Sequence, residues 1–166
     1  KADLQKHIDG IHLKLKPYSC DQCDYKFSQK SSLQAHIKIC TGELKCSAGE
    51  YQVMKTLDSM RIDYEYNSSF EVKNEGYLRW DFIINSDEPL FVEYDGRQHF
   101  EPRNFGGMSD EKALENFKKG QANDKIKNDY CNDMGYLLLR IPYTDYGNIN
   151  KIVADFIINN TNWGFE

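Results

Sequence analysis

The segment at residues 79–100 constrains the fold of this chain most, because two strand-like stretches flank a turn there. The first reads R-W-D-F-I-I at 79–84, and the second reads P-L-F-V-E-Y-D-G-R-Q-H-F at 89–100. From Leu90 to Asp95 the residues alternate between two faces with the period of two that a strand requires. Turn-forming residues, N-S-D-E-P, lie between the stretches. The pattern predicts an antiparallel hairpin centred near Asp87.

Such a hairpin sets two acidic side chains opposite one another. Asp81 is predicted to lie across from Glu93, and cross-strand partners have side chains roughly 5 Å apart. Two carboxylates at that distance repel unless one is protonated or a cation lies between them. Oxygen ligands of this kind suit a hard divalent ion such as Mg²⁺ or Mn²⁺. The chemistry indicated is metal-assisted attack on a phosphodiester.

The same residues carry a family resemblance. Asp81-F-I-I followed by F-V-E-Y-D-G-R-Q-H at 91–99 resembles the active-site hairpin of the PD-(D/E)XK nuclease superfamily. It is most similar to the very-short-patch-repair and restriction-like branch with an E-x-D-G-x-x-H signature. The resemblance extends over residues 47–166 and implies a Mg²⁺-dependent DNA endonuclease domain. One departure is that Asp95 stands where the superfamily usually has a lysine.

The resemblance implies specific roles around this hairpin. Asp81, Glu93 and the backbone carbonyl of Tyr94 would hold the metal. Asp95 or His99 would orient or deprotonate the attacking water, since a histidine with a pKa near ~6.5 suits proton transfer. The alternative for His99 is packing beside Phe100 and bonding the loop.

Other candidate residues lie outside the hairpin. Lys125 or Lys127 could replace the missing lysine and stabilise transition-state charge, the alternative being solvated lysines on an exposed helix face. Glu50 is either the capping partner of Ser47 or the helix-borne acid that superfamily members direct at the metals. Gln98 is a candidate phosphate contact.

A second, independent motif is Cys20-x2-Cys23-x12-His36-x3-Cys40. Two cysteines on a hairpin, followed by two ligands one helical turn apart, can close a tetrahedral site on structural Zn²⁺. A domain of this size, residues 16–43, needs the metal to fold. Over residues 17–42 the segment resembles the zinc-finger class with two cysteines and two histidines, with Cys40 replacing the last histidine.

The zinc finger suggests a contact with double-stranded DNA. By the resemblance, the reading positions −1, 3 and 6 of the helix fall on Gln29, Ser32 and Ala35, and Lys30 would contact phosphate. The alternative is a finger that contacts protein or is purely structural. Residues 1–15, with His7 and His12, resemble the C-terminal remnant of a preceding finger.

Charge and cysteine usage fit this division. The net charge is −5, but residues 1–45 carry eight Lys and five acidic residues, a net of +3, and the remainder carries −8. Bound Mg²⁺ would offset part of that excess.

Five cysteines, four of them within 20–46, indicate an intracellular, reducing compartment rather than a disulfide framework. Composition predicts no membrane span and leaves the oligomeric state open, a dimer included.

The expected fold class is α/β, a mixed β-sheet flanked by helices as in restriction endonucleases, after a small ββα zinc finger. Periodicity predicts helices at 48–60, 110–119, 121–131 and 148–160, with a break at Gly120. Strands are expected at 62–66, 69–72, 78–84, 90–95 and 136–141. Two rival functions remain: a non-catalytic binding module that kept the fold, and an RNA nuclease.

Overall fold

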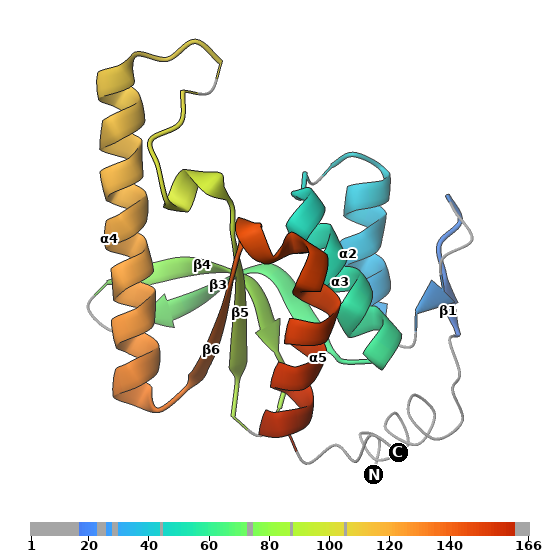
Figure 1. The fold of residues 1–166 in the computed structure, drawn as a ribbon. Helices are drawn as coiled ribbons and strands as arrows, with labels where there is room; N and C mark the ends of the chain where they lie inside the picture. The colour runs from blue at the N-terminus through green and yellow to red at the C-terminus, as the bar shows by residue number, and fades with distance from the viewer. Residues whose placement is uncertain are drawn as a thin grey trace. The chain divides into compact units, whose positions relative to one another are not determined.

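The computed structural model describes residues 17–22, 26–27, 30–43, 45–72, 75–86, 88–104 and 106–161 (Figure 1). His7, His12, Cys23 and Gln29 lie outside these residues. The chain divides into two compact units, one of residues 1–66 with 149–166 and the other of residues 67–148. No helix in the described part of the chain is long and apolar enough to cross a membrane.

The N-terminal region of the first unit has a ββα arrangement. Strand β1 (Tyr18–Ser19) pairs antiparallel with β2 (Lys26–Phe27), and helix α2 (Lys30–Cys40) contacts both strands. Phe27 is buried, and its ring lies 4.9 Å from that of His36. An aromatic residue and a histidine thus occupy the interior of a module too small for a larger apolar core.

Two helices pack together in the rest of the first unit. Helix α3 (Ala48–Met60) has the predicted bounds, and helix α5 (Ile149–Asn160) lies against it. Ser47 caps α3 in a complete capping box with Glu50, which satisfies the first backbone N–H groups. Apolar residues at helical spacing are buried on both helices: Val53, Leu57, Val153 and Ile157. Thr56 and Gln52 also bond Asn150 across the pair.

The strands form a four-stranded mixed sheet in the order β3-β4-β5-β6. They are β3 (Tyr64–Val72), β4 (Gly76–Ile84), β5 (Leu90–Asp95) and β6 (Leu137–Pro142). Phe82 pairs with Val92 and Ile84 with Leu90, which confirms a hairpin centred near residue 87. Strand β6 runs parallel to β5, with Arg140 beside Glu93. The parallel connection is made by helix α4 (Asp110–Met134).

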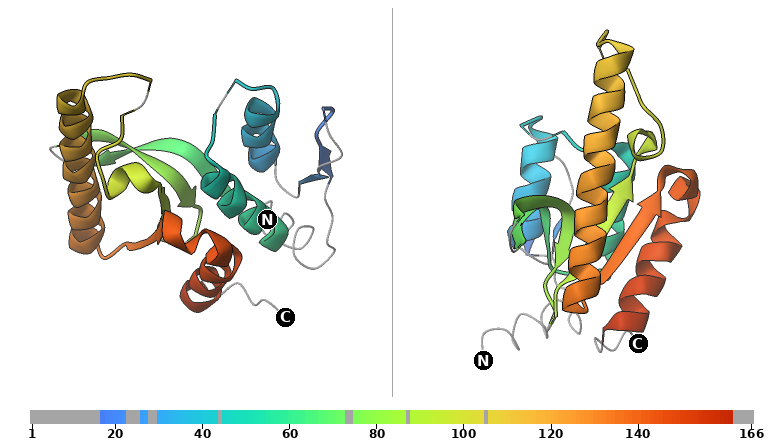
Figure 2. Two further views of the ribbon diagram at one scale, coloured as in Figure 1. Left: turned by 45° about the horizontal axis from the view of Figure 1, so that its top comes forward. Right: turned by 90° about the vertical axis from the view of Figure 1, so that its left-hand side faces the viewer.

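Helix α4 packs on the sheet through an aromatic core. Trp80, Ile83, Phe91 and Cys131 are buried there, with Tyr130 and Tyr136 against them. Trp80 and Ile83 belong to the same cluster although they are three residues apart on β4. Figures 1 and 2 show the N-terminal half of α4 extending beyond the ends of the strands.

Two element predictions were wrong, and two short helices were not predicted. Gly120 does not end a helix: α4 continues through it for 25 residues, because one glycine costs only about 1 kcal/mol relative to alanine. The two expected strands at 62–66 and 69–72 are one strand, β3, in which Asn67 takes a φ of 52° that asparagine tolerates. The residues after Gly96 form a short 3₁₀ helix, η2 (Arg97–His99), and a second one, η3 (Tyr143–Asn148), precedes α5.

Candidate functional site

Three of the four predicted zinc ligands converge in the ββα module. The ligand atoms of Cys20, His36 and Cys40 all lie within 4.8 Å of one another. Burial lowers the pKa of His36, which favours the neutral imidazole that binds metal. Thiolate and imidazole donors at this spacing fit Zn²⁺. Cys23, the fourth predicted ligand, lies outside the described residues.

The predicted DNA-reading positions follow from where α2 begins. The helix starts at Lys30, whose side chain is exposed. Ser32 and Ala35 lie on α2, and Gln29 precedes it outside the described residues. Counting from Lys30, Ser32 and Ala35 are the third and sixth residues of α2, and their contact with DNA stays a prediction.

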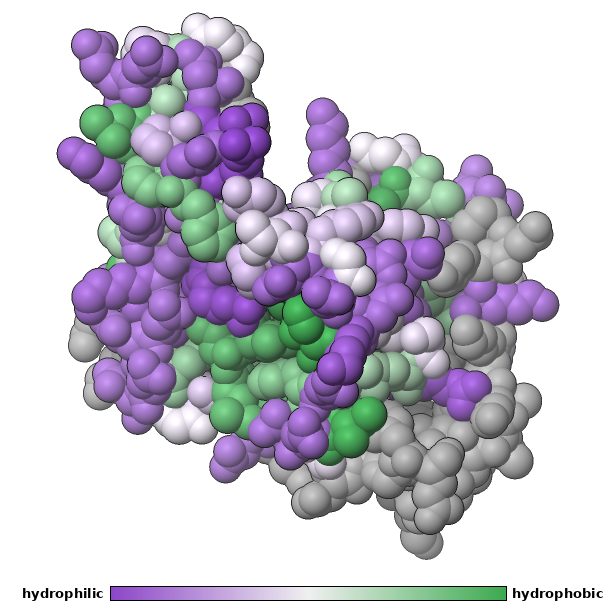
Figure 3. Space-filling view, in the orientation of Figure 1, coloured by the Kyte–Doolittle hydropathy of each residue, from purple (hydrophilic) through white to green (hydrophobic). Residues whose placement is uncertain are grey.

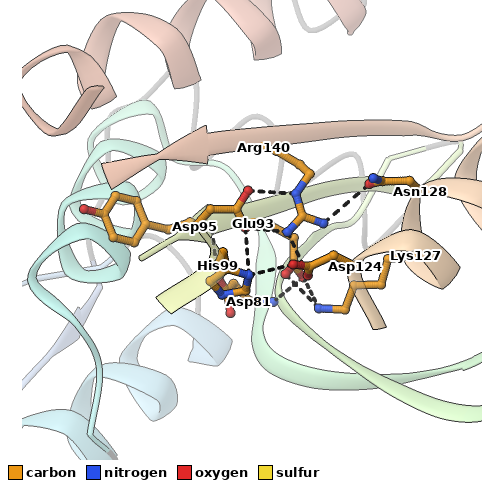
Figure 4. A network of polar contacts seen from close by, with 9 residues as sticks. Asp81, Glu93, Asp95, His99, Asp124, Lys127, Asn128 and Arg140 are labelled. Carbon is orange, nitrogen blue, oxygen red and sulfur yellow. Dashed lines mark hydrogen bonds and ion pairs between the residues drawn. The ribbon is translucent and has the colours of Figure 1, made fainter. Parts of the chain in front are cut away.

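In the second unit, Asp81 and Glu93 lie on neighbouring strands, and the carboxylate of each accepts a hydrogen bond from a backbone N–H of the opposite strand. The backbone N–H of Asp81 donates to Oε1 of Glu93 at 3.2 Å, and the N–H of Tyr94 donates to Oδ2 of Asp81 at 2.8 Å. Glu93 is only 3% exposed. The two carboxylates are therefore fixed at one place on the β4–β5 hairpin (Figure 4).

Lys127, and not Lys125, reaches this pair from α4. Its Nζ lies 2.8 Å from Oε1 and 2.7 Å from Oε2 of Glu93, and 5.1 Å from the Trp80 ring centroid. Lys125 instead pairs with Asp129 on the exposed side of the helix. Residues two apart point in different directions on a helix, so one of the two predicted lysines is buried and the other is solvated.

Asp95 lies in a second part of the same network, held by an arginine. Arg140 Nε donates to Asp95 Oδ2 at 2.8 Å, and Nη2 donates to Asp95 Oδ1 at 2.5 Å. The same Nη2 lies 2.8 Å from Oδ1 of Asp124, and Nη1 contacts Asn128. This is the bidentate geometry that a planar guanidinium favours.

His99 completes the network from η2. Its Nδ1 lies 2.8 Å from Oδ2 of Asp124 and 3.6 Å from Oδ1 of Asp95. The hydrogen bond that His99 donates to the Asp124 carboxylate raises the pKa of His99, against the opposing effect of burial. Burial would raise the pKa of Asp124, but its contacts with His99 and Arg140 lower it. Burial also raises the pKa of Glu93, against the opposing charge of Lys127.

Asp124 and Arg140 are the residues that sequence reasoning missed. Each carried a weak signal: Asp124 lies three residues before Lys127, on the same helix face, and Arg140 is the one charge in the apolar run L-L-L-R-I. The parallel β5–β6 register, in which Arg140 lies beside Glu93 and Pro142 beside Asp95, brings Arg140 to Asp95. Asp124 joins from α4 through its contacts with Arg140 and His99.

Two further predicted residues have contacts of their own. Glu50 accepts from the backbone of Ser47 and from the Tyr66 hydroxyl at 2.7 Å, so the predicted capping contact is present. Gln98 is exposed, and its amide folds back over Gly96, where an added Cβ would lie 2.5 Å from Oε1.

The carboxylates of this network are oxygen donors that could hold a divalent cation. Lys127 contacts the carboxylate of Glu93, and Arg140 contacts those of Asp95 and Asp124. The carboxylate of Asp81 accepts from the Tyr94 N–H. The donor atoms of Asp95, His99 and Asp124 also lie within 4.8 Å of one another, but Arg140 already binds both of those carboxylates.

Comparison with known proteins identifies one part of the chain. Residues 18–39 match the family described as zinc finger, C2H2 type. No curated protein and no solved structure matches the chain. The matched segment holds Cys20 and His36 and ends one residue before Cys40. The chain is therefore a mixed α/β protein that carries a C2H2-type zinc finger, a module that indicates nucleic-acid binding.

Proposed function

We propose that this protein is a Mg²⁺- or Mn²⁺-dependent DNA endonuclease whose zinc finger tethers it to double-stranded DNA. The observation that carries the proposal is the single network in which carboxylates from β4, β5 and α4 meet Lys127 and His99. The hairpin resembles that of the PD-(D/E)XK superfamily, and a mixed sheet flanked by helices is compatible with a restriction-endonuclease-like fold.

Asp81, Glu93 and the carbonyl of Tyr94 would hold the metal. When bound, a divalent ion supplies a Lewis acid and lowers the pKa of water. Because both oxygens of Glu93 contact Lys127, metal binding requires the ammonium to release one of them. Lys127 then remains beside the site as a cation for the developing phosphate charge.

His99 is positioned to move a proton. Its Nδ1 bonds the Asp124 carboxylate, which assigns the proton of the neutral ring to Nδ1 and leaves Nε2 as the basic atom. A carboxylate behind an imidazole stabilises the imidazolium that forms when Nε2 accepts a proton. Asp95 is bound by Arg140, so we assign Asp95 to positioning and His99 to proton transfer.

Plasmid cleavage with Mg²⁺, with zinc retained and no chelator present, tests the proposal. Asp81→Asn is the cleanest variant, because its amide oxygen still accepts from the Tyr94 N–H while one negative charge is lost. Cleavage should fall at least a hundredfold in Asp81→Asn and Glu93→Gln, on the order of the contribution of a positioned catalytic group. Glu115→Gln, an exposed charge on α4, is the matched control. If Asp81→Asn cleaves plasmid DNA at the wild-type rate, the assignment of Asp81 as a catalytic metal ligand is wrong.

A non-catalytic nucleic-acid-binding module is the second candidate. It is favoured by one observation: Lys127 and Arg140 already neutralise Glu93 and Asp95. Titration of the zinc-loaded protein with Mn²⁺, followed by electron paramagnetic resonance, separates the two. The nuclease should bind Mn²⁺ in an Asp81-dependent manner, and the binding module should not. Parallel assays with RNA test the remaining alternative of an RNA nuclease.

A further inference from the structure

Helix α4 contains a glycine that the structure of the helix does not require. Gly120 lies in the middle of the 25 residues, where glycine is less stable than alanine. A Cβ built at this position meets no atom within 4 Å, and the backbone conformation there is one that any residue adopts. Neither close packing nor a special φ therefore accounts for it.

Gly120 lies in the wall of a pocket of about 180 Å³. The pocket lies between one face of the N-terminal half of α4 and the segment that follows β5, and its lining is mainly apolar. Its walls include Gln98, His99, Arg103, Asn116, Phe117 and Gly120. Between α4 and this segment, Figure 3 shows pale and green residues among the hydrophilic ones.

The size and chemistry of the pocket suit one flat polar ring. A cavity of ~150 Å³ holds one benzene ring, so this pocket accommodates a single six-membered ring. Phe117 offers an aromatic surface for stacking. The amides of Gln98 and Asn116 offer both donors and acceptors. Arg103 is exposed to solvent and pairs with Glu101 at 3.3 Å, a surface contact that a phosphate could replace. A pyrimidine base attached to a phosphate has this combination of groups.

His99 connects the pocket to the acidic network. The same imidazole lines the pocket and bonds Asp124, so a molecule in the pocket lies beside the proposed reaction centre. We infer that the pocket binds the pyrimidine base of an unstacked nucleotide next to the scissile phosphate. This inference rests on the proposed nuclease function and adds a base-binding subsite to it. Gly120 lines the pocket without a side chain, and an added Cβ there meets open space, so a larger residue has room to occupy the pocket.

Binding of two single-stranded decamers by the full-length, zinc-loaded protein without added Mg²⁺ tests this subsite. One is a fluorescein-labelled decathymidylate, and the other has the same phosphates but abasic sugars. Base stacking on an aromatic side chain gives a preference of about tenfold for the decathymidylate. Gly120→Leu should reduce the ratio of the two affinities to about one and leave abasic binding unchanged. Gly147→Leu, at an exposed glycine with equally open surroundings, should behave as wild type.

Thermal melting separates loss of the subsite from loss of fold. Gly120→Leu and Gly120→Ala should raise the Tm by about 2–4 °C, because both residues favour the helix. A more stable protein that loses its base preference supports the inference. The inference is overturned if Gly120→Leu prefers decathymidylate over the abasic decamer as strongly as the wild type does. It is also overturned if the wild-type protein binds the two decamers equally well. If the wild type prefers decathymidylate and Gly120→Leu does not, but no plasmid is cleaved, the nuclease proposal fails and the proposal of a base-binding pocket is retained.

Discussion

Replacing Lys127 with methionine tests the buried ion pair at the centre of the site. The side chains of Lys127 and Glu93 are 11% and 3% exposed, and the ammonium contacts both carboxylate oxygens. Methionine keeps most of the volume of the side chain and removes the charge. Removing one member of a buried pair leaves the other charge without compensation, which costs about 3–5 kcal/mol.

The loss of stability in Lys127→Met should depend on pH, because Glu93 can take up a proton. Burial raises the pKa of Glu93 even beside Lys127, and removing the ammonium raises it further. A group with a raised pKa in the folded state stabilises the protein below its ordinary pKa, about 4.3 for Glu, and that stability is lost as pH rises. Between the ordinary and the raised pKa, the Lys127→Met variant should lose about 1.4 kcal/mol of stability per pH unit.

Urea unfolding at pH 5 and pH 7 measures this difference. Trp80 lies in the same unit, 5.1 Å from Lys127 Nζ, so its fluorescence in a Trp163→Phe background reports the relevant unit. Lys125→Met, in an exposed pair, should show no measurable change at either pH. Lys127→Met with Glu93→Gln should remove the pH dependence. A loss in Lys127→Met below about 1 kcal/mol at pH 7, or equal losses at both pH values, would refute the reasoning.

Three further predictions concern other parts of the molecule. His99→Gln should destabilise the protein more at pH 5.5 than at pH 8.5, because the raised pKa of His99 gives stability that is present below about pH 6.5 and lost as pH rises through the raised value; thermal melts at both pH values check this. Cys40→Ala should weaken Co²⁺ binding and reduce the intensity of the thiolate–cobalt absorption, because one thiolate ligand is lost, and an unchanged spectrum would exclude Cys40 as a ligand. Ser47→Ala should lower the free energy of unfolding by about 1 kcal/mol in urea denaturation, because the cap to Glu50 N–H is lost, whereas a neutral result would mean that water replaces the cap.

Several elements could be predicted from local sequence because their signals are local. The capping box at Ser47 and the apolar spacing after it gave helix α3 its observed bounds. The two strand-like stretches that flank the turn near residue 87 predicted the β4–β5 register. The spacing of Cys20, His36 and Cys40 predicted that they converge. Each of these patterns depends on contacts within about twenty residues, where chain geometry leaves few alternatives.

The sequence by itself therefore determined the ββα zinc finger, the acidic hairpin and most of the helices. Only the tertiary structure decided which charges meet: Lys127 rather than Lys125 on Glu93, and Arg140 and Asp124 around Asp95 and His99. The tertiary structure also allows α4 to continue through Gly120, because the packing of the helix on the sheet outweighs the low helix propensity of glycine. The physical reason is that these contacts join segments 25–45 residues apart, and their partners are fixed by strand register and helix rotation, which no local pattern encodes.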